Sequence, residues 1–163
     1  MPDVYVVAGS NIEPGKRLQQ ALALLTVEFG PLRVSPAYRN KTVGFAGEDF
    51  INLAIGFATD QRPARVIERL QLVEERCGRP RNAPKWQARS MDLDIVLYGD
   101  LVCTEPGLVL PRPDLVRRAY MLKPMTDIAP DVVHPTLGRR LVELWDQSGD
   151  HEHMLQPVEL DQS

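Results

Sequence analysis

The sequence has few of the residues that mark disulfide-rich, zinc-binding or membrane proteins. Its 163 residues include two cysteines, Cys77 and Cys103, and three histidines. Two thiols in unlike surroundings support neither a disulfide framework nor a zinc knuckle, so we expect both to be reduced. No apolar run approaches the roughly 20 residues that span a bilayer, and the apolar stretch at residues 4–8 is too short for a secretory signal. The sequence therefore predicts a cytoplasmic protein that contacts no membrane.

An excess of one charge is also missing. Lys and Arg number 19 against 22 Asp and Glu, which leaves a formal net charge of −3. A balance this small excludes the broad basic face of a general nucleic-acid coat. The length suits one compact domain, so we expect residues 1–163 to form a single, monomeric domain with residues 151–163 as a frayed tail. We expect no metal role for His134, or for His151 and His153 in that tail.

The main signal that is present is a regular pattern of apolar residues. Short apolar or alternating runs predict strands at residues 4–8, 32–38, 50–59 and 91–97. A helical period predicts helices that begin at Pro14 and Pro63 and end at Gly30 and Gly78. This order of elements is a split βαβ unit, and it predicts an α+β ferredoxin-like sandwich whose helices pack on one face of an antiparallel sheet. A short helix at 119–128 and an amphipathic segment at 137–145 are expected C-terminal additions.

Two of the expected strands have distinct faces, because side chains alternate along a strand. In the strand at 50–59, one face carries Ile51, Leu53, Ile55 and Phe57, and the other carries Phe50 and Asn52. In the strand at 91–97, one face carries Leu93, Ile95 and Leu97, and the other carries Asp92, Asp94 and Val96. The polar residues are thus predicted to lie on the faces opposite the long apolar stripes.

Asp92 and Asp94 form a pair of carboxylates on one strand face. Residues two apart in a strand point the same way, with Cα atoms about 6.5–7 Å apart. Carboxylates this close repel each other unless a cation neutralises them. Mg²⁺, which often binds together with phosphate oxygens, suits that need. The alternative is that this end of the sheet faces water and both side chains are simply solvated.

The segment before this strand is strongly basic. From residue 76 to residue 89 there is no acidic side chain, and the cations are Arg76, Arg79, Arg81, Lys85 and Arg89. Arginine forks that grip phosphate oxygens beside carboxylates that hold Mg²⁺ are typical of phosphoryl-transfer sites. The alternatives are a solvated basic loop or a nucleic-acid patch. Trp86 is the only aromatic residue of the segment, which argues against nucleic acid.

A second group of residues suits a flat ligand. The segment 40–49 mixes glycine with polar residues and is predicted to be a long loop that leads into the strand at Phe50. Gly44, Phe45, Phe50 and Asn52 offer flat apolar surfaces and one amide, which suit a planar heterocycle with hydrogen-bonding edges. The alternative is that the two phenylalanines belong to the core and Asn52 caps a turn.

These residues also carry a resemblance to a known family. The motifs are Gly9-Ser10-Asn11, Asp49-Phe50-Ile51-Asn52, Glu74, and the run from Gly78 through Trp86, Arg89 and Ser90 to Met91-Asp92-Leu93-Asp94-Ile95. Over residues 4–137 the sequence resembles the 6-hydroxymethyl-7,8-dihydropterin pyrophosphokinases of the folate pathway. The resemblance implies a ferredoxin-like fold. It also implies transfer of the pyrophosphoryl group of ATP to the hydroxymethyl oxygen of the pterin, which releases AMP.

The resemblance further implies roles for individual residues. Asp92 and Asp94 would hold two Mg²⁺ ions on the phosphates of ATP, the co-substrate, and Arg79 and Arg89 would be catalytic. ATP would be bound by Gln71, Glu74, Arg81, Lys85, Trp86, Ile95, Arg112 and Arg118. The pterin would be bound by Val43, Gly44, Phe50, Asn52 and Tyr120. Neither a nucleic acid nor a membrane is an implied partner.

The sequence departs from the family pattern on the nucleotide side. Arg112 stands where family members usually have histidine, and unlike histidine it does not titrate near neutrality. Gly107 and Val109 replace a basic residue and a hydroxyl, and Lys85 stands where arginine is common. The alternatives to the enzyme are therefore a paralogue with an altered substrate and a non-catalytic module that binds a nucleotide or a pterin.

Overall fold

The computed structural model describes residues 1–40, 49–78, 91–149 and 155–160. Its helices are α1 (Pro14–Phe29), α2 (Pro63–Arg76), α3 (Asp114–Arg117), α4 (Ala119–Ile128) and α5 (Leu141–Gln147). Its strands are β1 (Asp3–Ser10), β2 (Arg33–Val34), β3 (Ala37–Asn40), β4 (Phe50–Ala58), β5 (Asp92–Tyr98), β6 (Cys103–Glu105), β7 (Leu108–Leu110) and β8 (Leu155–Val158). Within these residues, no helix is both long and apolar enough to cross a membrane.

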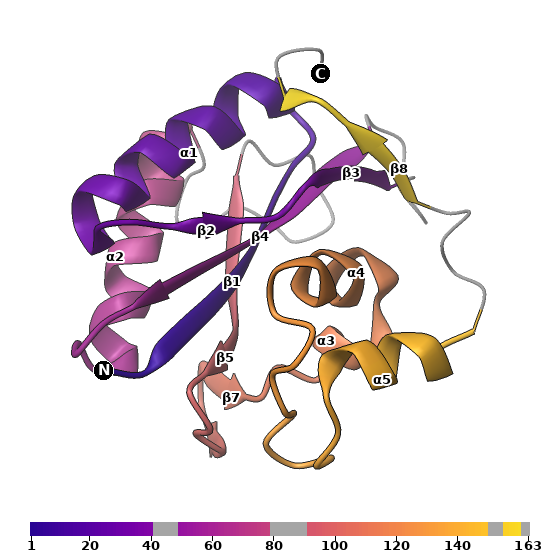
Figure 1. The fold of residues 1–163 in the computed structure, drawn as a ribbon. Coiled ribbons are helices and arrows are strands. Elements are labelled where there is room, and N and C mark those ends of the chain that lie inside the picture. The colour runs from indigo at the N-terminus through magenta and orange to yellow at the C-terminus, as the bar shows by residue number, and fades with distance from the viewer. Residues whose placement is uncertain (41–48, 79–90, 150–154, 161–163) are drawn as a thin grey trace.

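The main sheet has the strand order β5-β1-β4-β3-β8, and β2 also pairs with β4 (Figure 1). Every pairing in it is antiparallel. β1 lies between β4 and β5, although the three strands are far apart in the sequence. β6 and β7 form a separate two-stranded hairpin. The predicted α+β ferredoxin-like fold is confirmed.

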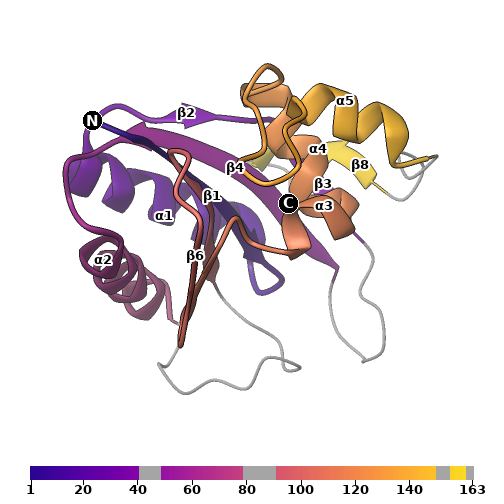
Figure 2. The ribbon, with the colours of Figure 1, turned by 90° about the horizontal axis from the view of Figure 1, so that it is seen from below.

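The first two helices cover one face of the main sheet (Figures 1 and 2). Each begins with a proline at its first turn, where the missing N–H has no intrahelical partner to lose. Their buried apolar residues are Leu18, Ala21, Leu25, Val66, Leu70 and Val73. These pack with Ile51, Leu53, Ile55 and Phe57, the predicted apolar face of β4, in one core cluster. The two predicted helices and the faces of β4 are confirmed.

The opposite face of the sheet is covered as well, which differs from the expectation of helices on one face. Figures 1 and 2 show α3, α4 and α5 on that side. Met121, Leu122 and Met125 of α4 are buried there with Val7 and Ala54 of the sheet. The C-terminal additions therefore complete a second core, because the sheet's second face is also apolar and needs cover.

Residues 32–38, predicted to be one strand, form two short strands with a break at Ser35 and Pro36. Pro36 has no N–H to donate to a ladder. Ser35 takes over part of the pairing with Ala54. Its N–H donates to the Ala54 carbonyl at 2.9 Å, and its Oγ accepts the Ala54 N–H at 2.8 Å. A side chain thus substitutes for the backbone at the point where the strand bends.

The face predicted for Leu97 is wrong, because β5 contains a bulge. Val6 pairs with Ile95, whereas the preceding Tyr5 pairs with Leu97, so Val96 is an extra residue on β5. An extra residue shifts every later side chain to the other face. Leu97 therefore packs in the second core cluster with Tyr5, while Leu93 and Ile95 remain in the first. The bulge lies beyond Asp92 and Asp94, whose shared face is as predicted.

The end of the chain also differs from expectation. Residues 155–158, predicted to belong to a frayed tail, form β8, which pairs with β3 from Ala37 to Asn40. Leu155 is 9% exposed. The pairing was not visible as a periodic pattern because β8 is short and contains Pro157, which edge strands tolerate. The predicted amphipathic segment at 137–145 is helical only from Leu141, the first residue of α5.

A buried histidine holds the turn before α5. His134 is 4% exposed, and its Nδ1 accepts the backbone N–H groups of Thr136 at 3.3 Å and Leu137 at 3.2 Å. Its own backbone N–H donates to Arg139 and its carbonyl accepts from Gly138. Burial lowers the pKa of His134 below its ordinary 6.5. The neutral ring is therefore the form that the folded turn requires.

Acid should weaken this turn. The pKa of His134 in the folded protein lies below 6.5, so the unfolded chain takes up the proton first as the pH falls. The stability that His134 contributes is therefore present above about pH 6.5 and is lost as the pH falls toward the folded pKa. His134→Gln should cost about 1 kcal/mol at pH 7.5 and should flatten the pH dependence. Urea unfolding at pH 7.5 and 5.5 measures both. Equal pH slopes in the two proteins would contradict the assignment.

Candidate active site

Three neighbouring strands bring their polar residues together at one end of the sheet. Gly9 near the end of β1 pairs with Asn52 of β4 on one side and with Asp92 of β5 on the other. Two residues further along each strand, Val7 lies opposite Asp94. The register therefore places Asn52, Asp92 and Asp94 on one face. We call this set of residues, with Gly9 in the middle, the strand-end row.

Gly9 leaves room for a side chain of the neighbouring strand. A Cβ atom at this position would lie 2.5 Å from Nδ2 of Asn52 and 3.7 Å from Cδ1 of Phe50. The amide of Asn52 thus lies over Gly9, toward β5. Any larger residue at Gly9 would displace it.

Asn52 has a buried oxygen that is ready to accept a hydrogen bond. The residue is 5% exposed, and within the described part of the chain its Oδ1 has no hydrogen-bond partner. A buried acceptor without a partner costs free energy of about 1–3 kcal/mol. An unpaired buried acceptor next to the partly buried ring of Phe50 is typical of a binding site for a flat ligand that carries a hydrogen-bond donor.

The two aspartates are held on β5 from the side of α2. Between them, the Leu93 N–H points away from β1 and donates to Oε2 of Glu74 at 2.8 Å. Glu74 therefore provides a hydrogen-bond acceptor for the backbone N–H of Leu93, the residue between the two aspartates, on the open edge of β5. Asp92 and Asp94 are both partly exposed, so they can reach a ligand.

Arg112 brings a positive charge to the carboxylates. Its backbone N–H donates to the Val96 carbonyl at 3.0 Å, which fixes the chain after β7 against β5. Its Nη1 lies 3.7 Å from Oδ1 of Asp94, and its Nη2 lies 4.0 Å from Oδ2 of Asp114. Arginine at the position where the family usually has histidine thus lies beside the predicted metal ligand.

Tyr120, in the first turn of α4, belongs to the same neighbourhood. Burial raises the pKa of Tyr120, the carboxylates of Asp114 and Asp94 raise it further, and Arg118 and Arg112 oppose the shift. The phenol therefore stays neutral and can donate a hydrogen bond. Arg118, the residue before α4, is exposed. The structure thus brings Tyr120 and Arg112 close to Asp94.

The sequence analysis missed a polar link next to Asn52. Tyr38 of β3 pairs with Asn52, and its hydroxyl donates to Asp127 of α4. Asp127 also pairs with Lys123 at 3.3 Å. This link ties the helix cover to the strand that carries Asn52. The only signal in the sequence was that a tyrosine in a buried strand needs a partner for its hydroxyl, which does not reveal the partner.

The remaining predicted residues fall into two groups. Gln71 is exposed on α2 one turn before Glu74, whereas Ile95 is 7% exposed in the first core cluster, on the face opposite the aspartates. Outside the described residues lie Val43, Gly44, Phe45, Arg79, Arg81, Lys85, Trp86 and Arg89. Among the described residues there is no group of three or more potential metal-binding side chains of His, Cys, Asp or Glu.

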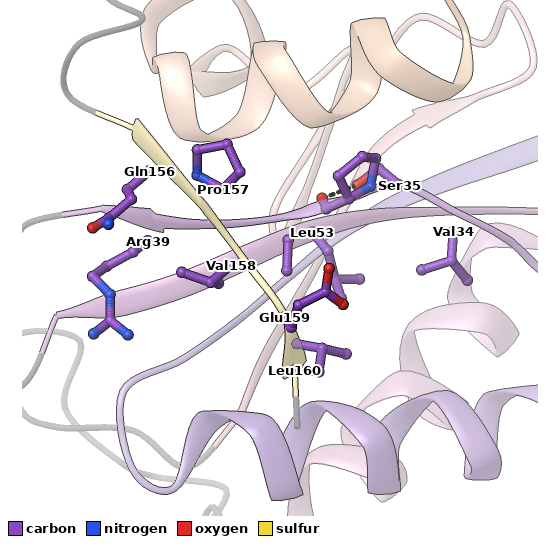
Figure 3. Close-up of a pocket in the computed structure, with 11 residues that line it drawn as sticks. Val34, Ser35, Arg39, Leu53, Gln156, Pro157, Val158, Glu159 and Leu160 are labelled. Atoms are coloured by element: carbon purple, nitrogen blue, oxygen red, sulfur yellow. Dashed lines mark hydrogen bonds between the residues drawn. The ribbon is translucent and has the colours of Figure 1, made fainter. Parts of the chain in front are cut away.

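A cavity of about 490 Å³ lies elsewhere, lined by residues of β2, β3, β4 and β8 and of the segments next to them (Figure 3). Its lining mixes apolar residues, among them Val34, Leu53 and Val158, with polar ones such as Arg39 and Glu159. Leu53 belongs to the face of β4 opposite Asn52. The cavity is therefore separate from the strand-end row.

The hydrogen bond from Leu93 to Glu74 should protect the segment that carries the aspartates. Glu74→Ala removes the acceptor, and hydrogen bonds to charged groups contribute about 1.5–3 kcal/mol, so the Leu93 amide should exchange at least about tenfold faster. Glu74→Gln keeps an acceptor and should retain part of the protection. Amide exchange by NMR measures this, with the exposed Glu75→Ala as the control. Unchanged protection of Leu93 in Glu74→Ala would contradict the role.

Comparison with known proteins adds a family to this geometry. A family model described as 7,8-dihydro-6-hydroxymethylpterin-pyrophosphokinase (HPPK) matches residues 5–130. A 2-amino-4-hydroxy-6-hydroxymethyldihydropteridine pyrophosphokinase of Pseudomonas aeruginosa is 37% identical over 145 residues, which is 86% of this chain and 88% of the relative. A protein of the same name from Synechocystis is 34% identical over 142 residues, which is 85% of this chain and 72% of the relative.

Solved structures show the same architecture. Wild-type HPPK-DHPS of Plasmodium falciparum superposes with a TM-score of 0.73 at 13% identity and covers 97% of this chain. This chain spans 47% of the length of that larger protein. At this identity the likeness supports the fold alone. The matched span from residue 5 to residue 130 contains the whole strand-end row together with Glu74, Arg112 and Tyr120, and the chain therefore belongs to the 7,8-dihydro-6-hydroxymethylpterin-pyrophosphokinase family.

Proposed function

We propose that this chain transfers the pyrophosphoryl group of ATP to the hydroxymethyl oxygen of 6-hydroxymethyl-7,8-dihydropterin and releases AMP. Family membership supports the reaction class. The observation that carries the proposal is the strand-end row, in which an unpaired buried amide oxygen on β4 and a carboxylate pair on β5 share one face of the sheet, with β1 between them. One half of the row suits a flat heterocycle and the other half suits a metal-bound polyphosphate.

The carboxylate half fits Mg²⁺. Asp92 and Asp94 share a strand face, are partly exposed, and have a cation beside Asp94. Mg²⁺ is usually held by one or two carboxylates, with water and substrate phosphates as its other ligands, so a pair suffices. Two Mg²⁺ ions bound here would neutralise the phosphates and lower the pKa of the attacking hydroxyl. Asp92 and Asp94 are therefore our proposed metal ligands.

The amide half fits the pterin. Asn52 offers its unpaired Oδ1 to the N–H groups of the heterocycle, and the ring of Phe50 supplies a flat surface near it. We assign the ring of Tyr120, on the side of Asp94, to the pterin as a second flat surface. Because Gly9 has no side chain, the amide of Asn52 has room to lie over β1. We assign Val43 and Gly44, which lie outside the described residues, to the same half because they match the family's pattern.

The nucleotide half draws on residues of several elements. We propose that Gln71, Glu74 and Ile95 approach the nucleotide from the side of α2 and β5, and that Arg112 and Arg118 bind its phosphates. We further propose that Arg79 and Arg89 act on the transferring phosphates and that Arg81, Lys85 and Trp86 contact ATP. These last five residues lie outside the described part of the chain.

The arrangement acts chiefly by positioning and by charge. The reaction needs an alcohol oxygen in line with the β-phosphorus, and charge spreads over the phosphate oxygens as transfer proceeds. Asn52 and the aromatic rings hold the pterin in one orientation, and the register of β1 sets its distance from the aspartates. Arginines stabilise the charge on the phosphates. No strong protein base is required, because the chain brings the two reactants together beside its metal ligands.

The product distinguishes this function from other kinases and from a binding module. With ATP, Mg²⁺ and the hydroxymethyl-dihydropterin, the protein should produce AMP and not ADP, which nucleotide chromatography measures. Asp94→Asn should lower turnover by about a thousandfold or more, because it removes several kcal/mol of charge stabilisation. The exposed Asp100→Asn, in the turn after β5, is the matched control and should leave turnover unchanged. Tight ligand binding without AMP would instead support the non-catalytic module.

Asn52 should control the pterin side selectively. Asn52→Ala removes the unpaired acceptor, and the lost hydrogen bond should weaken pterin binding by about 1–3 kcal/mol. Binding of a non-hydrolysable ATP analogue should not change. Calorimetric titrations with each ligand measure the two affinities, and Gln156→Ala, an exposed amide on β8, is the control. Equal weakening of both ligands would argue against a pterin contact at Asn52.

A further inference from the structure

The guanidinium of Arg112 lies beside the carboxylate of Asp94 and balances part of its charge. Its Nη1 lies 3.7 Å from Asp94 Oδ1 and its Nη2 lies 4.0 Å from Asp114 Oδ2. The Arg112 side chain is 31% exposed and that of Asp94 is 23% exposed. The guanidinium therefore lies on the same carboxylate that we propose as a metal ligand.

This ion pair is loose. Both separations exceed the 2.7–2.9 Å or so of a charge-assisted hydrogen bond. The Nε of Arg112 is buried, and no hydrogen-bond partner for it lies within the described residues. A guanidinium with a buried, unused donor has much to gain from a ligand rich in acceptor oxygens. The backbone of Arg112 is meanwhile anchored to Val96, so the side chain can move while the chain stays in place.

We propose that Arg112 is an internal counter-ion that competes with the metal for Asp94 and leaves it for the phosphates when metal and nucleotide arrive together. The proposal rests on the metal site of the proposed function. A carboxylate oxygen that faces a guanidinium is a poorer ligand for a second cation, because the two positive charges repel each other. A metal ion that binds without nucleotide must displace Arg112 from Asp94, and it brings no new anion to which Arg112 can bind. Metal with a nucleotide offers phosphate oxygens, to which an arginine fork binds well.

The consequence is coupled binding. The arginine should weaken the binding of metal alone and strengthen the binding of the metal–nucleotide complex, so that the site fills with both together. Because arginine stays charged at every physiological pH, the competition does not switch off near neutrality as it would with histidine. Besides its contact with the phosphates, Arg112 thus affects metal affinity and the order of binding.

Mn²⁺ is the probe that tests this. Free Mn²⁺ is titrated into wild type and Arg112→Gln and followed by electron paramagnetic resonance, first without nucleotide and then with α,β-methylene-ATP. In Arg112→Gln, Mn²⁺ alone should bind about fivefold tighter and the Mn²⁺–analogue complex should bind about fivefold weaker, within the usual range of coupling between sites. Arg117→Gln, which removes an exposed positive charge from the end of α3, should change neither.

Three outcomes separate the possibilities. Mn²⁺ affinity within error of wild type in Arg112→Gln would overturn the proposal. A matching gain in Arg117→Gln would also overturn it, because the effect would then be one of net charge. If Asp94→Asn binds Mn²⁺ as wild type does, the metal site of the proposed function is wrong and this inference falls with it. Arg112→Met, which keeps the apolar stem of the side chain, is a second variant. In both Arg112→Gln and Arg112→Met, Mn²⁺ alone should bind tighter and the Mn²⁺–analogue complex weaker. Circular dichroism shows whether the two variants fold.

Discussion

The register of β1 between β4 and β5 is the constraint on which the candidate site depends. Gly9 has Asn52 on one side and Asp92 on the other, so one backbone position sets the distance between an amide and a carboxylate pair. A shift of one residue would turn Asn52 or the aspartates into the core beneath α1 and α2. The absence of a side chain at Gly9 then leaves the space that the amide of Asn52 occupies.

The two cores explain why this register is stable. On one face, α1 and α2 bury the apolar side of β4 and the start of β5. On the other face, α4 buries Val7, which lies opposite Asp94, and Ala54, which pairs with Val7. The polar residues of the strand-end row therefore lie at the edge of the area that α4 covers. The hydrogen bond from Tyr38 of β3 to Asp127 of α4 holds the helix in place at this edge. Burial aligns the strands, and the uncovered end supplies the site.

The predictable features were those with a local cause. Alternation along β4 revealed its two faces, and prolines marked the starts of α1 and α2. The bulge at Val96 was not predictable, because an extra residue in a strand has no mark of its own in an apolar run. The break at Ser35 and Pro36 depends on a hydrogen bond to Ala54, and β8 depends on pairing with β3. Both involve partners that are distant along the chain.

The sequence by itself determined the first two helices and the long strands, the carboxylate pair of Asp92 and Asp94, the amide of Asn52 and the family resemblance, because periodicity and motifs are properties of neighbouring residues. Only the tertiary structure decided that Gly9 lies between these groups, that Glu74 binds the Leu93 N–H, and that Arg112 faces Asp94. Each of these contacts joins residues from separate elements. Their distances follow from how the two cores pack, which no local pattern contains.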